Sequence, residues 1–138
     1  MSKLLQVSNA TAQTVAANSF VNLGTITRRC DCNSNCPTFS YNGSTLITLN
    51  ATGYYEIGIT TDITSTAATQ QLVLSIIQDG VSVGDLSTYA TVAGEVSTKT
   101  RTFIVRVFCN NNTSLALQNT SAADAIISNL NVSIIKVA

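Results

Sequence analysis

Short apolar segments recur about every ten residues along this chain, and turn-forming residues separate them. The rhythm is clearest over residues 39–59, FSYNGSTLITLNATGYYEIGI, where Tyr55, Ile57 and Ile59 alternate with other residues. Alternation with a period of two is typical of a strand with one buried face. The strands expected from this pattern cover residues 15–27, 45–50, 54–64, 71–78, 81–86, 100–108, 114–118 and 129–137. The pattern therefore predicts an all-β, antiparallel sandwich.

Two short segments indicate how these strands are connected. Asp79-Gly80 lies between SIIQ and VSVG, and both residue types accept the positive φ angles of a two-residue type I′ hairpin. Residues 121–127 are compatible with a helical turn capped by Ser121 and Asp124, but a loop explains them equally well.

Length and charge limit the classes of function. The chain has 138 residues, 45% of them hydrophobic, so one domain with its own core is expected. Seven basic residues balance seven acidic ones, so no electrostatic field is available to attract nucleic acid or an anionic membrane. We expect no cleaved export signal and no membrane-spanning segment, because no apolar run is long enough for either.

Several strands are apolar on both faces, Leu72 to Leu74 and Ile134-Ile135 among them. We favour a second subunit over a covering loop as the explanation. The residues predicted to contact another subunit are Tyr55, Ile57, Leu72, Leu74, Ile76, Phe103, Val105 and Ile134. Ile104, Arg106 and Phe108 lie on the other face of their strand, and a buried Arg106 needs an acidic partner such as Asp62 or Glu56.

The chain resembles the trimeric jelly rolls of the tumour-necrosis-factor and complement globular-head superfamily. The residues that carry the resemblance are Phe39, Asn42, Leu49, Gly53, Tyr55, Ile57 and Ile59, together with the Asp79-Gly80 hairpin. The segments TVAANSFVNLGTITRRCDCN and GYYEIGITTDITSTAAT also look like small proteins encoded by tailed bacteriophages and prophages of gut Firmicutes. This second similarity runs over most of the chain.

These resemblances imply a homotrimer on the surface of a virion, assembled in the host cytoplasm as a capsid decoration or head fibre. With no stalk of its own, the protein is expected to dock directly, through an arm at residues 1–18 that precedes a jelly roll at 19–138. Phage capsid or other virion proteins are the expected partners. One alternative is a receptor- or carbohydrate-binding module that presents Tyr41, Tyr54, Tyr55 or Tyr89, and another is a bacterial surface or spore-coat head domain of the same fold.

The four cysteines allow three interpretations. Cys30, Cys32 and Cys36 are clustered and Cys109 is distant, but one end of a sandwich can bring all four together. Cys32 or Cys36 bonded to Cys109 gives a disulfide, and such bonds form late if assembly takes place in a reducing cytosol. The set also permits a zinc site of four thiolates, or of three with Asp31, and structural thiols are the third possibility.

Catalysis is the least favoured function. The chain has no His to act as a general base or to activate a cysteine, and its seven acidic residues are scattered singly. We therefore predict no catalytic residue, no bound cofactor and no enzymatic activity. Arg28-Arg29 is interpreted either as a contact to an acidic capsid surface or as a solvated strand end. The preferred function is a structural virion protein.

Overall fold

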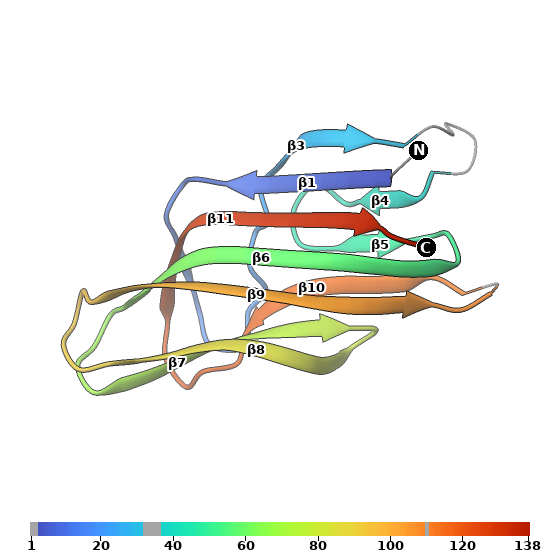
Figure 1. Ribbon diagram of the computed structural model, residues 1–138. Helices are drawn as coiled ribbons and strands as arrows, with labels where there is room; N and C mark the ends of the chain where they lie inside the picture. Colours follow the sequence, from blue (N-terminus) through green and yellow to red (C-terminus); the bar gives the residue numbers. More distant parts are fainter. Residues whose placement is uncertain (1–2, 32–36, 110) are drawn as a thin grey trace.

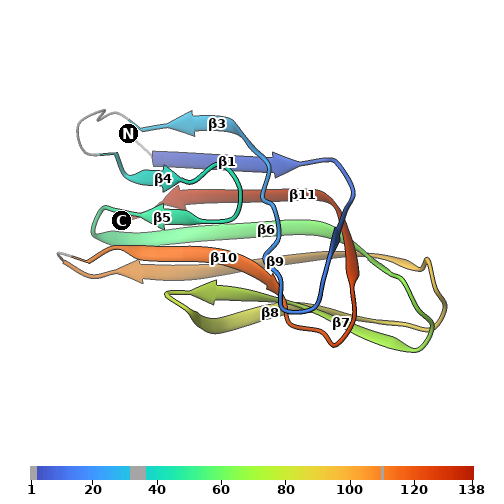
Figure 2. The same cartoon turned by 180° about the vertical axis from the view of Figure 1, so that it is seen from behind.

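The computed structural model describes residues 3–31, 37–109 and 111–138. These residues form eleven strands and no helix, in two antiparallel sheets packed face to face (Figures 1 and 2). The strands are β1 (Lys3–Asn9), β2 (Gln13–Val15), β3 (Thr25–Cys30), β4 (Phe39–Tyr41), β5 (Ile47–Leu49), β6 (Gly53–Ser65), β7 (Gln70–Gln78), β8 (Val81–Ala90), β9 (Val96–Val107), β10 (Thr113–Asn119) and β11 (Ala125–Lys136). The predicted all-β sandwich is confirmed.

Each sheet joins strands from distant parts of the sequence, as a jelly roll requires. One sheet has the order β3-β1-β11-β6-β9 with β2 also paired to β11, and the other has the order β4-β5-β10-β7-β8. Figure 1 shows that the described chain begins and ends at the same end of the sandwich, where β1 starts and β11 finishes. No helix capable of crossing a membrane occurs within the three described ranges.

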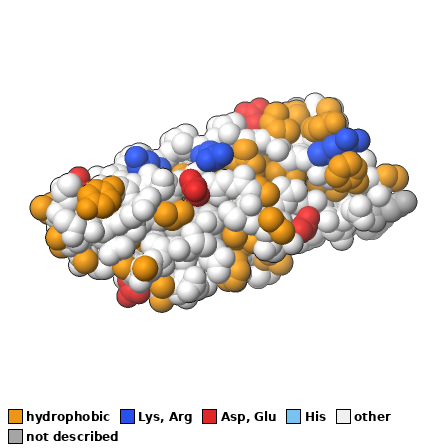
Figure 3. Space-filling model, turned by 90° about the horizontal axis from the view of Figure 1, so that it is seen from below, with side chains coloured by type: hydrophobic (Ala, Val, Ile, Leu, Met, Phe, Trp, Pro, Cys, Tyr) orange, Lys and Arg blue, Asp and Glu red, His pale blue; other side chains and the backbone are white. Residues whose placement is uncertain are grey.

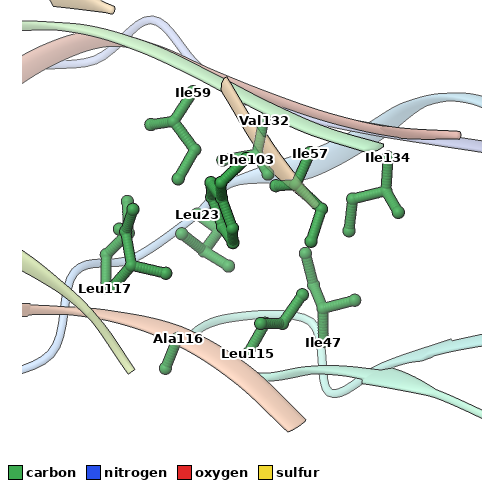
Figure 4. Close-up of a pocket in the computed structure, with 11 residues that line it drawn as sticks. Leu23, Ile47, Ile57, Ile59, Phe103, Leu115, Ala116, Leu117, Val132 and Ile134 are labelled. Atoms are coloured by element: carbon green, nitrogen blue, oxygen red, sulfur yellow. The ribbon is translucent and has the colours of Figure 1, made fainter. Parts of the chain in front are cut away.

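The inner faces of the two sheets form the core. Along β6, every second side chain from Tyr55 to Ser65 is buried, which is the expected consequence of strand alternation. The rings of Phe39 and Tyr55 meet edge to face across the two sheets, with centroids 6.0 Å apart. The core leaves an apolar cavity of about 20 Å³, lined by side chains such as Ile57, Phe103 and Leu117 (Figure 4). This space is about the size of one water molecule, so it is not a ligand pocket.

The predicted hairpin at Asp79-Gly80 is confirmed. Strand β7 ends at Gln78 and β8 begins at Val81, and φ is 51° at Asp79 and 82° at Gly80. The Asp79 carboxylate also accepts a hydrogen bond at 2.8 Å from the backbone N–H of Ser114, at the start of β10. The turn is therefore fixed to its own sheet.

The N-terminal region differs from the predicted arm. Strand β1 pairs with both β11 and β3, and Leu5 and Val7 are fully buried. Residues 3–9 and 13–15 are therefore strands of the six-stranded sheet and not a free arm, while docking through residues 1–18 stays a prediction. The continuous strand expected over 15–27 is also divided: residues 18–21 pair with the end of β10, through bonds such as Val21 N–H to Leu117 O at 2.9 Å, before β3 begins.

The segment before β11 is a turn held by a buried amide. Asn119 is fully buried, donates to the carbonyls of Val15 and Ala123 at 2.9 Å each, and accepts from the N–H of Ser121 at 3.0 Å. Strand β11 then contains a bulge between Ser128 and Asn131, where Asn129 has a φ of 49°. The bulge changes which alternate residues face the core, and this explains part of the apolar character on both faces of β11.

Candidate interaction surface

The outward face of the six-stranded sheet carries an exposed apolar cluster at one end. The cross-strand register places Leu4, Ile135, Glu56 and Ile104 in one row across β1, β11, β6 and β9. Beyond this row lie Tyr54, Arg106 and Phe108, together with Val137, whose N–H donates to the Tyr54 carbonyl at 2.9 Å. We call these eight residues the end patch: Leu4, Tyr54, Glu56, Ile104, Arg106, Phe108, Ile135 and Val137.

The end patch is unusually exposed for its composition. Ile104 is 64% exposed, Phe108 56% and Val137 51%. Figure 3 shows hydrophobic side chains gathered around basic atoms at the end of the molecule where β9 finishes. Hydrophobic side chains are more scattered over the rest of the surface seen in this view. A cluster of this kind is typical of a surface that another molecule covers.

Arg106 is held in place by aromatic rings and not by a carboxylate. Its guanidinium lies 4.5 Å from the centre of the Phe108 ring and 5.5 Å from that of Tyr54. Both distances suit a cation–π interaction. Arg106 is exposed, so the acidic partner expected for a buried arginine is not required; Asp62 instead bonds to Thr98 and Asn129.

The Glu56 carboxylate has no hydrogen-bond or ionic partner within the described parts of the chain. The ion pairs found there both involve Asp31, with Lys3 and with Arg29. Glu56 nevertheless stands between Ile135 and Ile104 in the apolar row. The end patch thus contains one cation and one anion that are not paired with each other or with any other described charge.

The middle of the same face is polar and internally bonded. The side-chain Oδ1 of Asn131 accepts from Gln6 at 3.1 Å and from Ser8 at 3.0 Å, and the hydroxyls of Thr60 and Thr100 lie 3.2 Å apart. Hydrogen bonds from Thr98 and Asn129 lower the pKa of Asp62. We call this region the polar band. Its groups are satisfied by one another, in contrast to the charges of the end patch.

The residues predicted as subunit contacts lie elsewhere. The eight are Tyr55, Ile57, Leu72, Leu74, Ile76, Phe103, Val105 and Ile134, and they pack in the core between the two sheets of one chain. Tyr55 and Ile134 are 0% exposed and Leu72 is 1% exposed. The prediction that these eight residues contact another subunit is therefore wrong, because their side chains point into the core. Their neighbours in sequence, such as Tyr54, Ile104 and Ile135, point outward. The sequence did contain a signal for these outward residues, because the strands are apolar on both faces.

Cys30 and Cys109 do not meet within one chain. Cys30 ends β3 and Cys109 follows β9, and these are the two edge strands of the six-stranded sheet. Three strands separate them, which corresponds to roughly 19 Å, far beyond the reach of a disulfide or a shared zinc ion. Cys32 and Cys36 lie outside the described residues, so pairings that involve them stay predictions. Among the residues that are described, no cluster of three or more His, Cys, Asp or Glu side chains is placed to hold a metal.

Asp31 has a structural role that the sequence did not reveal. Its side chain is 3% exposed, and its carboxylate accepts from the backbone N–H groups of Thr38 at 2.6 Å and Phe39 at 3.3 Å. Burial acts to raise the pKa of Asp31, but these hydrogen bonds and the one from Lys3 outweigh it, so the pKa is lowered. Asp31 therefore ties the end of β3 to the start of β4. Arg29, which also reaches this carboxylate, donates to the Phe39 carbonyl at 2.7 Å.

The tyrosines considered for sugar contact are mostly engaged. Tyr55 is buried and donates to the Ala51 carbonyl at 2.6 Å, and Tyr41 donates to the Gly24 carbonyl at 2.6 Å. Burial raises the pKa of both phenols. Tyr54 packs against Arg106 in the end patch, whereas Tyr89 is 59% exposed at the opposite end of the sandwich. Tyr89 is thus the most open of the four.

The architecture is the jelly roll of the tumour-necrosis-factor and complement globular-head proteins, as three solved structures show. Murine APRIL at pH 8.0 is similar with a TM-score of 0.72 and 10% identity, over 99% of this chain and 100% of that one. Eiger TNF from S. frugiperda gives 0.68 and 11%, over 100% and 92%. The globular domain of zebrafish complement 1qA gives 0.70 and 7%, over 100% and 98%. No protein-family model matches the chain, and neither does any curated protein.

Proposed function

We propose that this chain is a non-enzymatic homotrimeric head domain, displayed on the particle of a tailed bacteriophage as a capsid decoration or head fibre. The observation that carries the proposal is the end patch on the outward face of a sheet in a tumour-necrosis-factor-like jelly roll. The sequence resemblance to small phage-encoded proteins supports the virion location. The function is mechanical, since three subunits that cover their apolar patches form a rigid unit.

The chemistry of the end patch favours association over solvent exposure. Tyr54, Ile104 and Phe108 are 43%, 64% and 56% exposed, and aromatic and large aliphatic side chains with an arginine are enriched at the centres of interfaces. Strand β9, which supplies Ile104, is also an edge strand of its sheet. A ring of identical subunits buries the same surface on every copy and leaves none of it open.

Native mass spectrometry and sedimentation velocity of the purified chain test the assembly. A trimer that persists at micromolar concentration supports the proposal, and a monomer at all concentrations contradicts it. The variant Thr100→Asp is the control. It adds a charge to the polar band on β9 and leaves the end patch intact, so it is expected to assemble as the unchanged chain does.

The virion location needs a separate test. Quantitative proteomics of gradient-purified particles from an induced lysogen is expected to find the chain at a fixed ratio to the major capsid protein. Deletion of its gene is expected to leave filled heads that lack only this protein. Recovery of the chain from cells without particles, and its absence from particles, would instead favour a bacterial surface or spore-coat role.

Recognition of a surface glycan or receptor is the second candidate function. Tyr89 and Val92, near the end of β8 and in the turn that follows it, are 59% and 58% exposed. Figure 1 shows that this β8–β9 turn lies at the end of the sandwich opposite to the one where β9 finishes. An exposed tyrosine beside apolar residues suits stacking against a sugar face. Binding on a glycan array that Tyr89→Ala removes, while the assembly stays unchanged, would favour this function over a purely structural one.

A further inference from the structure

We infer that Glu56 of one subunit pairs with Arg106 of the next, so that the interface recognises its own copy by charge as well as by apolar contact. This inference rests on the proposed self-association through the end patch. It assigns the two charged residues a specific partner, namely each other across the subunit boundary.

The starting observation is that two opposite charges stand unpaired in an apolar surface. The register aligns Glu56 with Ile104 and Tyr54 with Arg106, so the two charged residues are diagonal neighbours on adjacent strands. Diagonal neighbours are roughly 7–8 Å apart. No ion pair within 4.0 Å joins them, and the Glu56 carboxylate accepts no hydrogen bond from the described chain.

Arg106 packs against its aromatic neighbours and forms no ion pair with Glu56. Its guanidinium lies 4.5 Å from the Phe108 ring centre and 5.5 Å from that of Tyr54. The two rings restrict the arginine, and its guanidinium N–H groups have no acceptor in the described residues. An arginine ordered in this way loses less conformational entropy when a carboxylate arrives.

An apolar partner that covered the end patch would bury both charges without counter-charges. A buried ion without a counter-charge is strongly unfavourable, so whatever covers the patch must supply a carboxylate near Arg106 and a cation near Glu56. A second copy of the patch offers one of each. A closed ring of copies repeats the same Arg106-to-Glu56 contact at every boundary and leaves neither charge unmatched.

Charge reversal tests this pairing. Glu56→Arg and Arg106→Glu are each expected to weaken association about tenfold or more, because each places like charges at every boundary. The double variant Glu56→Arg/Arg106→Glu is expected to recover most of the wild-type affinity. Sedimentation velocity across a dilution series measures all four proteins. The control Asp124→Arg makes the same change in net charge as Glu56→Arg, but at the far end of the sheet, where its exposed side chain bonds to no described residue. It is expected to associate as wild type does.

Mixing the two single variants distinguishes pairing between chains from pairing within one chain. Each variant alone carries two like charges, so an intrachain pair cannot be restored by mixing. Pairing between subunits is restored wherever unlike variants are neighbours. Native mass spectrometry of the mixture is therefore expected to show mixed assemblies in a larger proportion than random mixing of the two variants gives. A random or pure distribution overturns the inference.

The outcomes separate this inference from the proposed function. If wild type is monomeric at high concentration, the proposed assembly is wrong and the pairing is wrong with it. If wild type is a trimer but neither reversal weakens it, or the double variant is no better than the singles, the assembly stands and the charge pairing alone is overturned. Circular dichroism of every variant confirms that the comparison is made between folded chains.

Discussion

The two faces of the six-stranded sheet have similar side chains but different surroundings. Tyr55 is 0% exposed while Tyr54 is 43% exposed, and Ile134 is 0% exposed while Ile135 is 38% exposed. The inward residues are covered by the five-stranded sheet, and no described part of the chain covers the outward ones. The comparison shows that a hydrophobic pattern identifies a strand, whereas its function depends on which of its two faces the chain itself covers.

A charge on the inward face is expected to have the largest effect on the chain. Ile57→Asp puts a carboxylate at a site that is 1% exposed, and we expect it to cost more than about 4 kcal/mol and to unfold the chain. Circular dichroism and thermal unfolding measure this. Thr60→Asp, which lies on the outward face of the same strand, serves as the control and is expected to retain the fold. A cooperative Ile57→Asp transition close to that of wild type would show that the core assignment is wrong.

The same substitution on the outward face is expected to act on assembly alone. Ile104→Asp changes a residue that is 64% exposed in one chain, so the stability of the isolated subunit should shift by no more than about 0.5 kcal/mol. Association should weaken at least about tenfold, because a carboxylate then enters the apolar centre of the contact. Sedimentation velocity measures the association and urea titration of dilute protein measures the stability.

Val81→Asp is the matched control for Ile104→Asp. Val81 is 63% exposed but belongs to β8 in the other sheet. It is expected to leave both association and stability unchanged. Equal weakening of the assembly by both substitutions would indicate that the contact surface is not the end patch.

Sequence alone could predict most of the strands but not the face used for contact. Strands β6, β7 and β10 show local alternation or a short apolar run, and the Asp79-Gly80 turn depends only on two residues. A shift of one residue in the pairing register exchanges the inward and outward faces of a strand. A strand that is apolar on both faces carries no local signal that tells which face points inward. The interface prediction therefore selected Tyr55 and Ile134 where the exposed residues are Tyr54 and Ile135.

The N-terminal strand was missed for a different reason. Leu5 is buried because β1 pairs with β11, far away in the sequence, and this register places Leu5 beside Ile134 on the core face of the sheet. Such a contact depends on the complete topology, and the short alternation in KLLQVSN does not reveal it. Asp31 was likewise considered only as a metal ligand, because the backbone N–H groups that it accepts from come together only in the folded loop.

Asp31 and Glu56 differ in their partners: the Asp31 carboxylate accepts hydrogen bonds within its own chain, and the Glu56 carboxylate accepts none from the described residues. We expect Asp31→Asn to lower stability at neutral pH by about 1.5 kcal/mol, the usual loss for a hydrogen bond to a charged group. The folded-state pKa of Asp31 is below its ordinary value of 3.8. Its stabilising effect is therefore complete above that value and is lost as the pH falls through the lower, folded-state pKa.

Urea titrations from pH 7 to pH 2 measure this dependence. The difference between wild type and Asp31→Asn should be largest at neutral pH and should shrink below about pH 3.8. Glu56→Gln is the control from the end patch. All titrations use dilute protein, so that assembly does not contribute to the measured stability. A difference for Asp31→Asn that is unchanged at pH 2 would show that packing, and not the charge, is responsible.

The smallest expected effect concerns the polar band, which shares the outward face with the end patch. Asn131→Ala removes the acceptor for Gln6 and Ser8, at 3.1 and 3.0 Å, and these half-exposed donors can turn to water instead. The loss in subunit stability should therefore be about 1 kcal/mol. Because the band satisfies its own polar groups, association should change less than it does for Ile104→Asp. A dilution series at matched protein concentration compares the two variants. If Asn131→Ala dissociates the assembly as strongly as Ile104→Asp does, the contact extends across the whole sheet, and the internal hydrogen bonds of the band do not mark the boundary of the interface.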